Sequence, residues 1–87
     1  MGASKVLLNM EIEQRQEEIK QHTITFLKEE MEAKGISQLQ LQEASGVPQK
    51  TISRILNGHN MPSFPTLLAL CEALDADVSL TFTKENA

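Results

Sequence analysis

Apolar residues recur at helical spacing along most of the chain, and glycines interrupt this pattern. Residues 5–34 contain neither Gly nor Pro and are rich in good helix formers, so we predict one long helix or two abutting helices, ended by a left-handed cap at Gly35. In the second half of this segment, Ile24, Leu27 and Met31 lie three and four residues apart and are predicted to face a core. The polar first half has a thin apolar stripe, which needs a partner surface. That stripe consists of Leu8, Ile12, Ile19 and Phe26.

Two short helices separated by a tight turn are predicted next. Ser37 is a suitable N-cap with Gln40 three residues later, a capping-box pattern that starts a helix running to about position 45. Gly46 closes this helix, and Pro48 fits the first turn of the following helix, which ends at residues 57–58. The apolar side of that helix consists of Val47, Ile52, Ile55 and Leu56.

A fourth helix is predicted to start at the N-cap Ser63, with Pro65 tolerated in its first turn. The side chains expected to face the core are Leu67, Leu68, Leu70, Cys71 and Leu74. After this helix the apolar period changes to two. Val78, Leu80 and Phe82 alternate with Ser and Thr residues, which predicts a strand.

A lone strand leaves its backbone N–H and C=O groups unpaired, and no second strand is recognisable in the sequence. Pairing with the same strand of a second copy around a two-fold axis would satisfy these groups. We therefore expect Val78, Leu80 and Phe82 to form a homodimer interface. The alternative is a tail that packs Leu80 and Phe82 on its own core.

The length and composition of the chain argue against several classes of function. A chain of 87 residues forms one compact domain and leaves little room for an active site that encloses a substrate. No apolar run is long enough to span a bilayer, and the N-terminus lacks the hydrophobic stretch of a signal peptide, so no membrane association is expected. The single cysteine, Cys71, cannot form an intrachain disulfide, which fits a reducing cytoplasm.

The middle of the chain resembles the Xre/Cro/CI family of helix-turn-helix repressors. The matching positions are Ser37-Gln38, Leu41, Gly46-Val47, Gln49, Thr51-Ile52-Ser53-Arg54, Asn57-Gly58, Pro62-Ser63 and Thr66-Leu67. The resemblance covers about residues 24–75, and its density makes it more specific than a lone short motif. It implies a fold in which the second helix of the motif enters the major groove of double-stranded operator DNA.

The elements and the resemblance together predict an all-α, lambda repressor-like helix-turn-helix bundle of four to five helices, with one short C-terminal β-strand that pairs across a dimer. We divide the chain into an N-terminal polar helix or extension (1–22), a DNA-binding domain (23–76) and a dimerisation strand and tail (77–87). No cofactor is expected.

The resemblance also implies which side chains contact DNA. Gln49, Lys50 and Thr51 open the recognition helix and would meet base edges, because a glutamine amide can pair with adenine and a lysine can donate to guanine. Further residues would contact the phosphate backbone and position the protein without reading sequence. These are Gln38, Ser53, Arg54, His59 and Asn60.

The charge distribution is compatible with this interpretation, although the net charge is -4. Residues 35–65 carry two basic side chains and one acidic side chain, whereas both flanking segments are net acidic. Such a segment attracts phosphates weakly. Non-specific affinity should therefore be low and salt-dependent, and specific affinity has to come from geometry and dimerisation.

Two positions depart from the family pattern. Gln42 stands where the family usually has a small alanine, so we expect a looser contact between the two helices of the motif. Pro48 stands where a serine or threonine often opens the recognition helix, so one capping or phosphate contact is expected to be missing.

Other chemistry is not indicated. His22, His59 and Cys71 do not lie at metal-ligand spacing, so no metal site is expected. The sequence has no nucleophile with a base at a recognisable spacing and no glycine-rich phosphate loop, so we do not expect an enzyme.

Alternatives to a repressor remain. A fourth helix followed by a terminal strand resembles HipB-type antitoxins, which dimerise through that strand, bind a partner toxin and repress their own operon. The long acidic N-terminal segment would then offer a surface for the toxin, or it would add dimer contacts or face solvent. A third possibility is a dimerisation module that no longer binds DNA.

Overall fold

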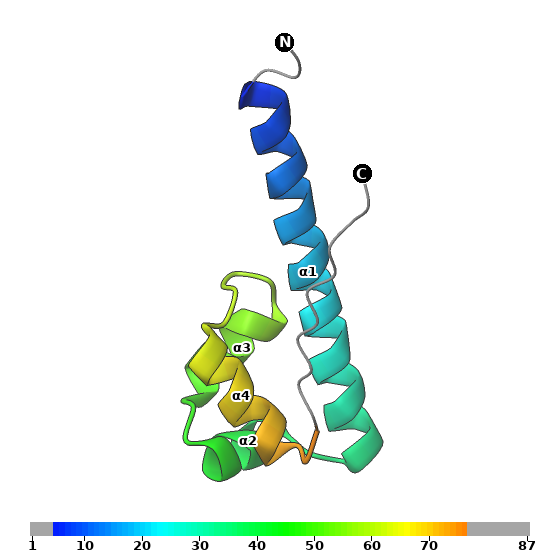
Figure 1. The fold of residues 1–87 in the computed structure, drawn as a ribbon. Coiled ribbons are helices and arrows are strands. Elements are labelled where there is room, and N and C mark those ends of the chain that lie inside the picture. The colour runs from blue at the N-terminus through cyan, green and yellow to red at the C-terminus, as the bar shows by residue number, and fades with distance from the viewer. Residues whose placement is uncertain (1–4, 77–87) are drawn as a thin grey trace.

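The computed structural model describes the backbone of residues 5–76 and the side chains of residues 9–76, and this part of the chain folds into four α-helices (Figure 1). They are α1 (Lys5–Lys34), α2 (Gln38–Ser45), α3 (Gln49–Leu56) and α4 (Phe64–Ala73). Helices α2, α3 and α4 are grouped beside the C-terminal half of α1, and the N-terminal half of α1 projects beyond them (Figure 1). The all-α bundle predicted from the sequence is thus confirmed.

Helix α1 is a single element. It continues from Lys5 to Lys34 and passes the predicted domain boundary at residues 22–23, so the two abutting helices left open by the sequence are one. It ends as expected, because Gly35 adopts the left-handed conformation with φ 65°. The N–H of Ile36 then donates to the carbonyl of Met31 at 2.9 Å and completes the cap.

A single apolar core lies between the helices, and no polar or charged side chain is buried within the described part of the molecule. Helix α1 contributes one face to this core, as its spacing predicts, and the predicted apolar side of α3 is buried in full. The buried core residues are Ile24, Leu27, Met31, Leu41, Val47, Ile52, Ile55, Leu56, Leu70, Cys71 and Leu74.

The sequence assigned α4 one core residue too many. Leu70, Cys71 and Leu74 are buried and Leu67 is half-buried, but the side chain of Leu68 is 38% exposed. Leu68 lies outside the arc of the helix that faces the core, because a rotation of about 100° per residue takes it away from Leu70 and Leu74. The expectation that Leu68 faces the core is wrong.

The apolar stripe of α1 is exposed over its described length. Ile12, Ile19 and Phe26 are 47%, 55% and 37% exposed, and the side chain of Leu8 lies outside the described residues. These residues follow one another at intervals of seven, on a different side of the helix from the core residue Leu27. The stripe therefore takes no part in the core.

Two lysines attach α1 to the rest of the molecule. The Lys20 ammonium donates to the carbonyl of Gly58, just after α3, at 3.2 Å. The Lys34 ammonium donates to the carbonyl of Leu74 at the end of α4. Because the two anchors lie fourteen residues apart on α1, they fix the ends of both α3 and α4 against the same helix.

None of the helices in the described part of the chain is both long and apolar enough to cross a membrane. The predicted strand of Val78, Leu80 and Phe82 lies outside the described residues, and its pairing stays a prediction.

Candidate nucleic-acid interface

The turn between α2 and α3 sets the geometry of the motif. Gly46 ends α2 in the left-handed conformation with φ 79°, and its N–H donates to the carbonyl of Gln42 at 2.8 Å. The Ser45 hydroxyl donates to the carbonyl of Leu41 at 2.6 Å and accepts the N–H of Val47 at 3.1 Å. The buried Val47 side chain then fixes the turn to the core.

The start of α3 is capped from α2. Pro48 occupies the N-cap position, one residue before the helix, and makes no side-chain capping bond. The predicted place of Pro48 in the first turn is therefore off by one residue. The N–H of Gln49 instead donates to Oε1 of Gln42 at 2.5 Å. Gln42 therefore forms a direct contact between the two helices, where we had expected a looser one.

The outward face of α3 carries the residues implied as sequence readers. Because Ile52, Ile55 and Leu56 are buried, helical geometry turns Lys50 and Arg54 to the opposite side. The other predicted contacts on α3 flank this face. Gln49, Lys50 and Arg54 are exposed, and Thr51 and Ser53 are half-buried.

The end of α3 brings three of the predicted contacts together. Gly58, with φ 80°, lets the N–H of His59 donate back to the carbonyl of Arg54 at 2.9 Å. The amide of Asn60, in the orientation that satisfies both of its polar atoms, accepts from Arg54 Nε at 3.1 Å. The same amide donates to the carbonyl of His59 at 2.9 Å. Arg54, His59 and Asn60 thus form one hydrogen-bonded group.

Gln38 lies at the other end of the motif, in the first position of α2. The predicted capping box is present, since Ser37 Oγ accepts the N–H of Gln40 at 3.1 Å and Gln40 Oε1 accepts the N–H of Ser37 at 2.9 Å. Gln38 borders an open hollow next to this helix start, together with Lys28 and Asn57. A helix N-terminus of this kind favours an anion, because its first N–H groups point outward.

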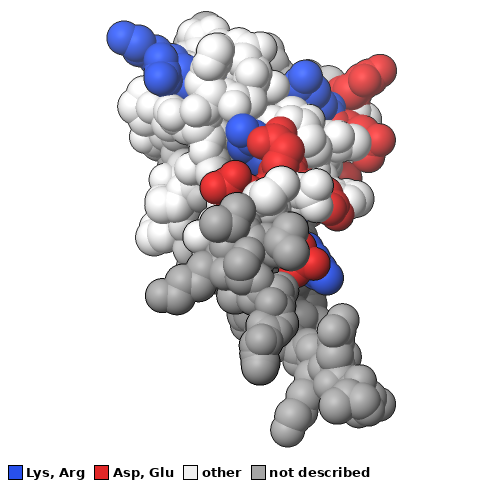
Figure 2. Space-filling view, turned by 90° about the horizontal axis from the view of Figure 1, so that it is seen from above, with Lys and Arg blue, Asp and Glu red and all other residues white. Residues whose placement is uncertain are grey.

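The acidic side chains lie largely around α1. In Figure 2 one group of Lys and Arg side chains is free of acidic neighbours, whereas other basic side chains on that face lie beside Asp or Glu. Two of the α1 lysines form ion pairs along the helix, Lys20 with Glu17 at 3.3 Å and Lys34 with Glu30 at 2.9 Å. Hydrogen bonds from Gln21 and Lys20 lower the pKa of Glu17, with a further contribution from the Lys20 charge.

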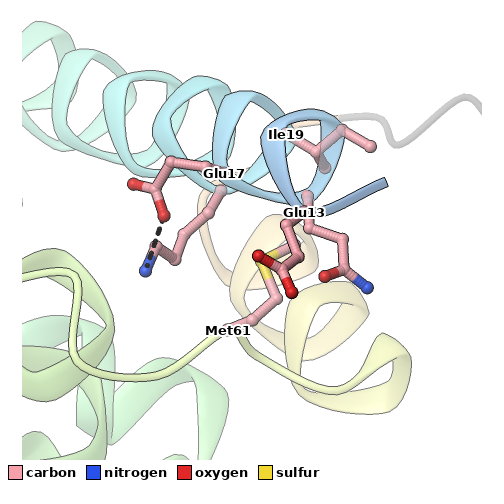
Figure 3. Close-up of a pocket in the computed structure, with 6 residues that line it drawn as sticks. Glu13, Glu17, Ile19 and Met61 are labelled. Carbon is pink, nitrogen blue, oxygen red and sulfur yellow. Dashed lines mark ion pairs between the residues drawn. The ribbon is translucent and has the colours of Figure 1, made fainter. Parts of the chain in front are cut away.

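A second hollow is lined by α1 residues and Met61. It has a volume of about 430 Å³ between α1 and the loop that precedes α4. Figure 3 shows Met61 reaching toward α1 below Glu13, while Ile19 points away from Met61. Among the described side chains, no group of three His, Cys, Asp or Glu residues could hold a metal ion.

Two structural contacts that support the motif are not predicted by the sequence. The sequence predicts a looser contact between the helices at Gln42 and makes no prediction for Lys20. The missing cap at Pro48 is the one signal that could have pointed to Gln42, because a helix start without a side-chain cap needs another acceptor. Nothing in the local pattern pairs Lys20 with Gly58, thirty-eight residues away.

Comparisons with known proteins agree with this geometry. A family model described as helix-turn-helix matches residues 27–80, which include all of α2, α3 and α4. Searches of curated proteins and of solved structures gave no match. The matched region covers more than half of the chain and contains the turn, the outward face of α3 and every buried core residue except Ile24. The chain therefore belongs to the Xre/Cro/CI-type family of helix-turn-helix, DNA-binding transcriptional regulators.

Proposed function

We propose that this protein is a repressor that binds operator DNA as a homodimer, with α3 as the recognition helix. The supporting observation is the division of α3 into two faces. Ile52, Ile55 and Leu56 anchor it in the core, and the polar side chains of Gln49 and Lys50 remain free at its leading end. A rigid helix with an exposed polar start is what a major groove can accommodate.

Base reading is assigned to Gln49, Lys50 and Thr51. Gln49 has an amide that can both donate to and accept from adenine, and Lys50 can donate to guanine. The half-buried Thr51 offers a hydroxyl and a methyl group at the edge of the same face.

Backbone binding is assigned to five further residues. Gln38 would contact a phosphate from the start of α2, and the other four would contact phosphates from α3 and the loop after it. The hydrogen bonds among Arg54, His59 and Asn60 support a common role for these three. Ser53 on α3 is the remaining residue assigned to the phosphate backbone.

The proposal includes a dimer, because one recognition helix contacts only a few base pairs. Two copies related by a two-fold axis would place their α3 helices about 34 Å apart, on successive major grooves. The interface assigned to this dimer is the segment with Val78, Leu80 and Phe82. We also place the protein in the cytoplasm and assign it no catalytic activity, in line with its single cysteine and its family.

An antitoxin is the second candidate, and the exposed stripe on α1 favours it. The apolar stripe of Ile12, Ile19 and Phe26 lies on α1, whose N-terminal half projects beyond α2, α3 and α4 (Figure 1). Such a stripe suits a protein partner such as a toxin. An adjacent reading frame for a toxin favours this candidate, and a divergent promoter within a prophage favours a phage repressor.

Gel retardation tests the base-reading assignment. Operator sites are first selected from random DNA with the wild-type protein. Gln49→Ala and Lys50→Ala should then abolish the preference for those sites over scrambled DNA, while the oligomeric state stays the same. Gln14→Ala and Arg15→Ala on the exposed part of α1 are the matched controls. If the Gln49 and Lys50 variants keep full selectivity, the assignment is wrong.

Light scattering tests the dimer. A protein without residues 78–87 should be monomeric and should bind the operator far more weakly, because the two half-sites are no longer bound together. Circular dichroism checks that the helices remain. A truncated protein that is still a dimer would place the interface elsewhere, with residues 5–22 as the next region to test.

A further inference from the structure

We propose that Gln42 is a positioning residue for sequence reading: its side chain sets where α3 begins and so holds Gln49 and Lys50 in register with the bases. The inference rests on the proposed role of α3 as the recognition helix. It concerns a residue of α2 that is not itself a DNA contact in that proposal.

The start of α3 needs an acceptor that its own N-cap residue does not supply. Pro48 has no side-chain oxygen or nitrogen, and it makes no capping bond. Helix α3 has eight residues, so its first turn is a large part of the element. An isolated helix of that length is unstable in water, and its ends depend on capping and packing. The reading residues lie in this first turn.

Gln42 provides an acceptor for the first N–H of α3 and also fixes the other end of the turn. Its side-chain Oε1 accepts the N–H of Gln49 at 2.5 Å, and its backbone carbonyl accepts the N–H of Gly46 at 2.8 Å. One half-buried residue of α2 thus holds both the first residue of the turn and the first residue of α3. Gln42 therefore holds residues 46–48 through one hydrogen bond at each end of the turn.

The neighbouring contacts explain why no other group does this work. The Ser45 hydroxyl is occupied by the carbonyl of Leu41 and the N–H of Val47. The carbonyl of Pro48 already accepts the N–H of Ile52 at 3.0 Å, inside the helix ladder. Loss of the Gln42 side chain would leave the Gln49 N–H to water and free the leading turn to fray.

A double-mutant cycle at residues 42 and 48 tests the proposal. Gln42→Ala removes the acceptor. Pro48→Ser adds an N-cap hydroxyl, which can accept the N–H of Lys50 or Thr51. We expect Gln42→Ala to weaken operator binding by about fivefold per recognition helix, with little change in binding to scrambled DNA. Pro48→Ser should restore most of the loss in the Gln42→Ala protein and should change the wild type much less.

Two further measurements separate positioning from stability. Binding is measured well below the unfolding midpoint of each variant, where every protein is folded by circular dichroism. Gln42→Glu keeps an acceptor oxygen, so the amide of Gln49 should exchange as slowly as in wild type, whereas Gln42→Ala should speed the exchange of that amide.

The outcomes are distinguishable. If Gln42→Ala lowers the melting temperature but leaves the ratio of operator to scrambled-DNA affinity unchanged, Gln42 is merely structural and the inference is overturned. Equal loss of both affinities, or no rescue by Pro48→Ser, overturns it as well. Gln49→Ala is the companion control. If it abolishes selectivity and Gln42→Ala does not, base reading by α3 stands and only the role of Gln42 fails.

Discussion

The side-chain amide of Asn60 accepts a hydrogen bond from Arg54 Nε at 3.1 Å, across the turn that ends α3. The same amide is tied to the carbonyl of His59, so the guanidinium of Arg54 is held by the loop that follows its own helix. The Arg54 side chain is exposed. This contact orients a cation that we assign to a DNA phosphate.

The first prediction concerns Asn60→Ala. Because the pair is exposed and Arg54 is assigned to the backbone, we expect a modest loss of about two- to threefold in affinity, equal for operator and scrambled DNA. Fluorescence anisotropy with labelled duplexes measures both affinities, and Asn9→Ala on the exposed start of α1 is the control. A change in the ratio of the two affinities would mean that Asn60 or Arg54 reads bases.

The second prediction compares two leucines of α2. Leu41 is 1% exposed and Leu39 is 50% exposed, two positions apart on the same helix. Leu41→Ala should lower the free energy of unfolding by about 2–5 kcal/mol, because it removes apolar contacts and leaves a cavity. Leu39→Ala should change it by less than about 0.5 kcal/mol. Urea unfolding followed by circular dichroism measures both, and similar losses would contradict the described core.

The third prediction concerns the turn at Gly46. No atom outside residues 45–47 lies within 4 Å of the position that a Cβ would occupy, so a side chain would meet only the cost of the left-handed backbone. Gly46→Ala should cost about 1 kcal/mol of unfolding free energy, and Gly46→Asn should cost less, because asparagine tolerates this conformation. Equal costs in a thermal-melting comparison would show that contacts, and not the backbone, decide the effect.

The fourth prediction concerns the thiol of Cys71, which is 2% exposed. Burial raises its pKa, and the nearby Glu30 charge adds to this effect. A thiol-specific reagent should therefore react slowly with the native protein and rapidly with the urea-unfolded protein.

The raised pKa of the Cys71 thiol also predicts how the free energy of unfolding changes at alkaline pH. Because the pKa of the thiol is higher in the folded than in the unfolded chain, its contribution to stability is complete below about pH 8.5 and is lost as the pH rises toward the folded pKa. Urea unfolding across that range should show a smaller decline for Cys71→Ala than for wild type. An identical decline in both proteins would contradict the assignment.

Local signals in the sequence predicted the elements well. The capping box of Ser37 and Gln40, and the glycines that end the helices, depend on residues within one turn of each other. The spacing of Ile24, Leu27 and Met31 defined the buried face of α1 for the same reason. A run of consecutive apolar residues is less informative, because it does not reveal which side of a helix faces inward, and Leu68 was misplaced for that reason.

Hydrogen bonds between different helices could not be predicted from the sequence. The bond from Gln49 to Gln42 spans seven residues and a turn, and the bond from Lys20 to Gly58 spans thirty-eight residues. Both depend on how the helices are placed in space, which no local pattern specifies. The existence and the buried face of α3 could be predicted, whereas the contacts that hold α3 in place could not.

The projecting half of α1 has a consequence for backbone amide exchange. About 22 Å of helix precede Lys20, at 1.5 Å per residue, and this stretch has no core residue of its own within its described side chains. A solvated helix of that length opens readily, so protection should fade turn by turn from Ile24 toward the N-terminus. A ligand bound to Ile12 and Ile19 would raise the protection of these N-terminal amides without contacting α2, α3 or α4.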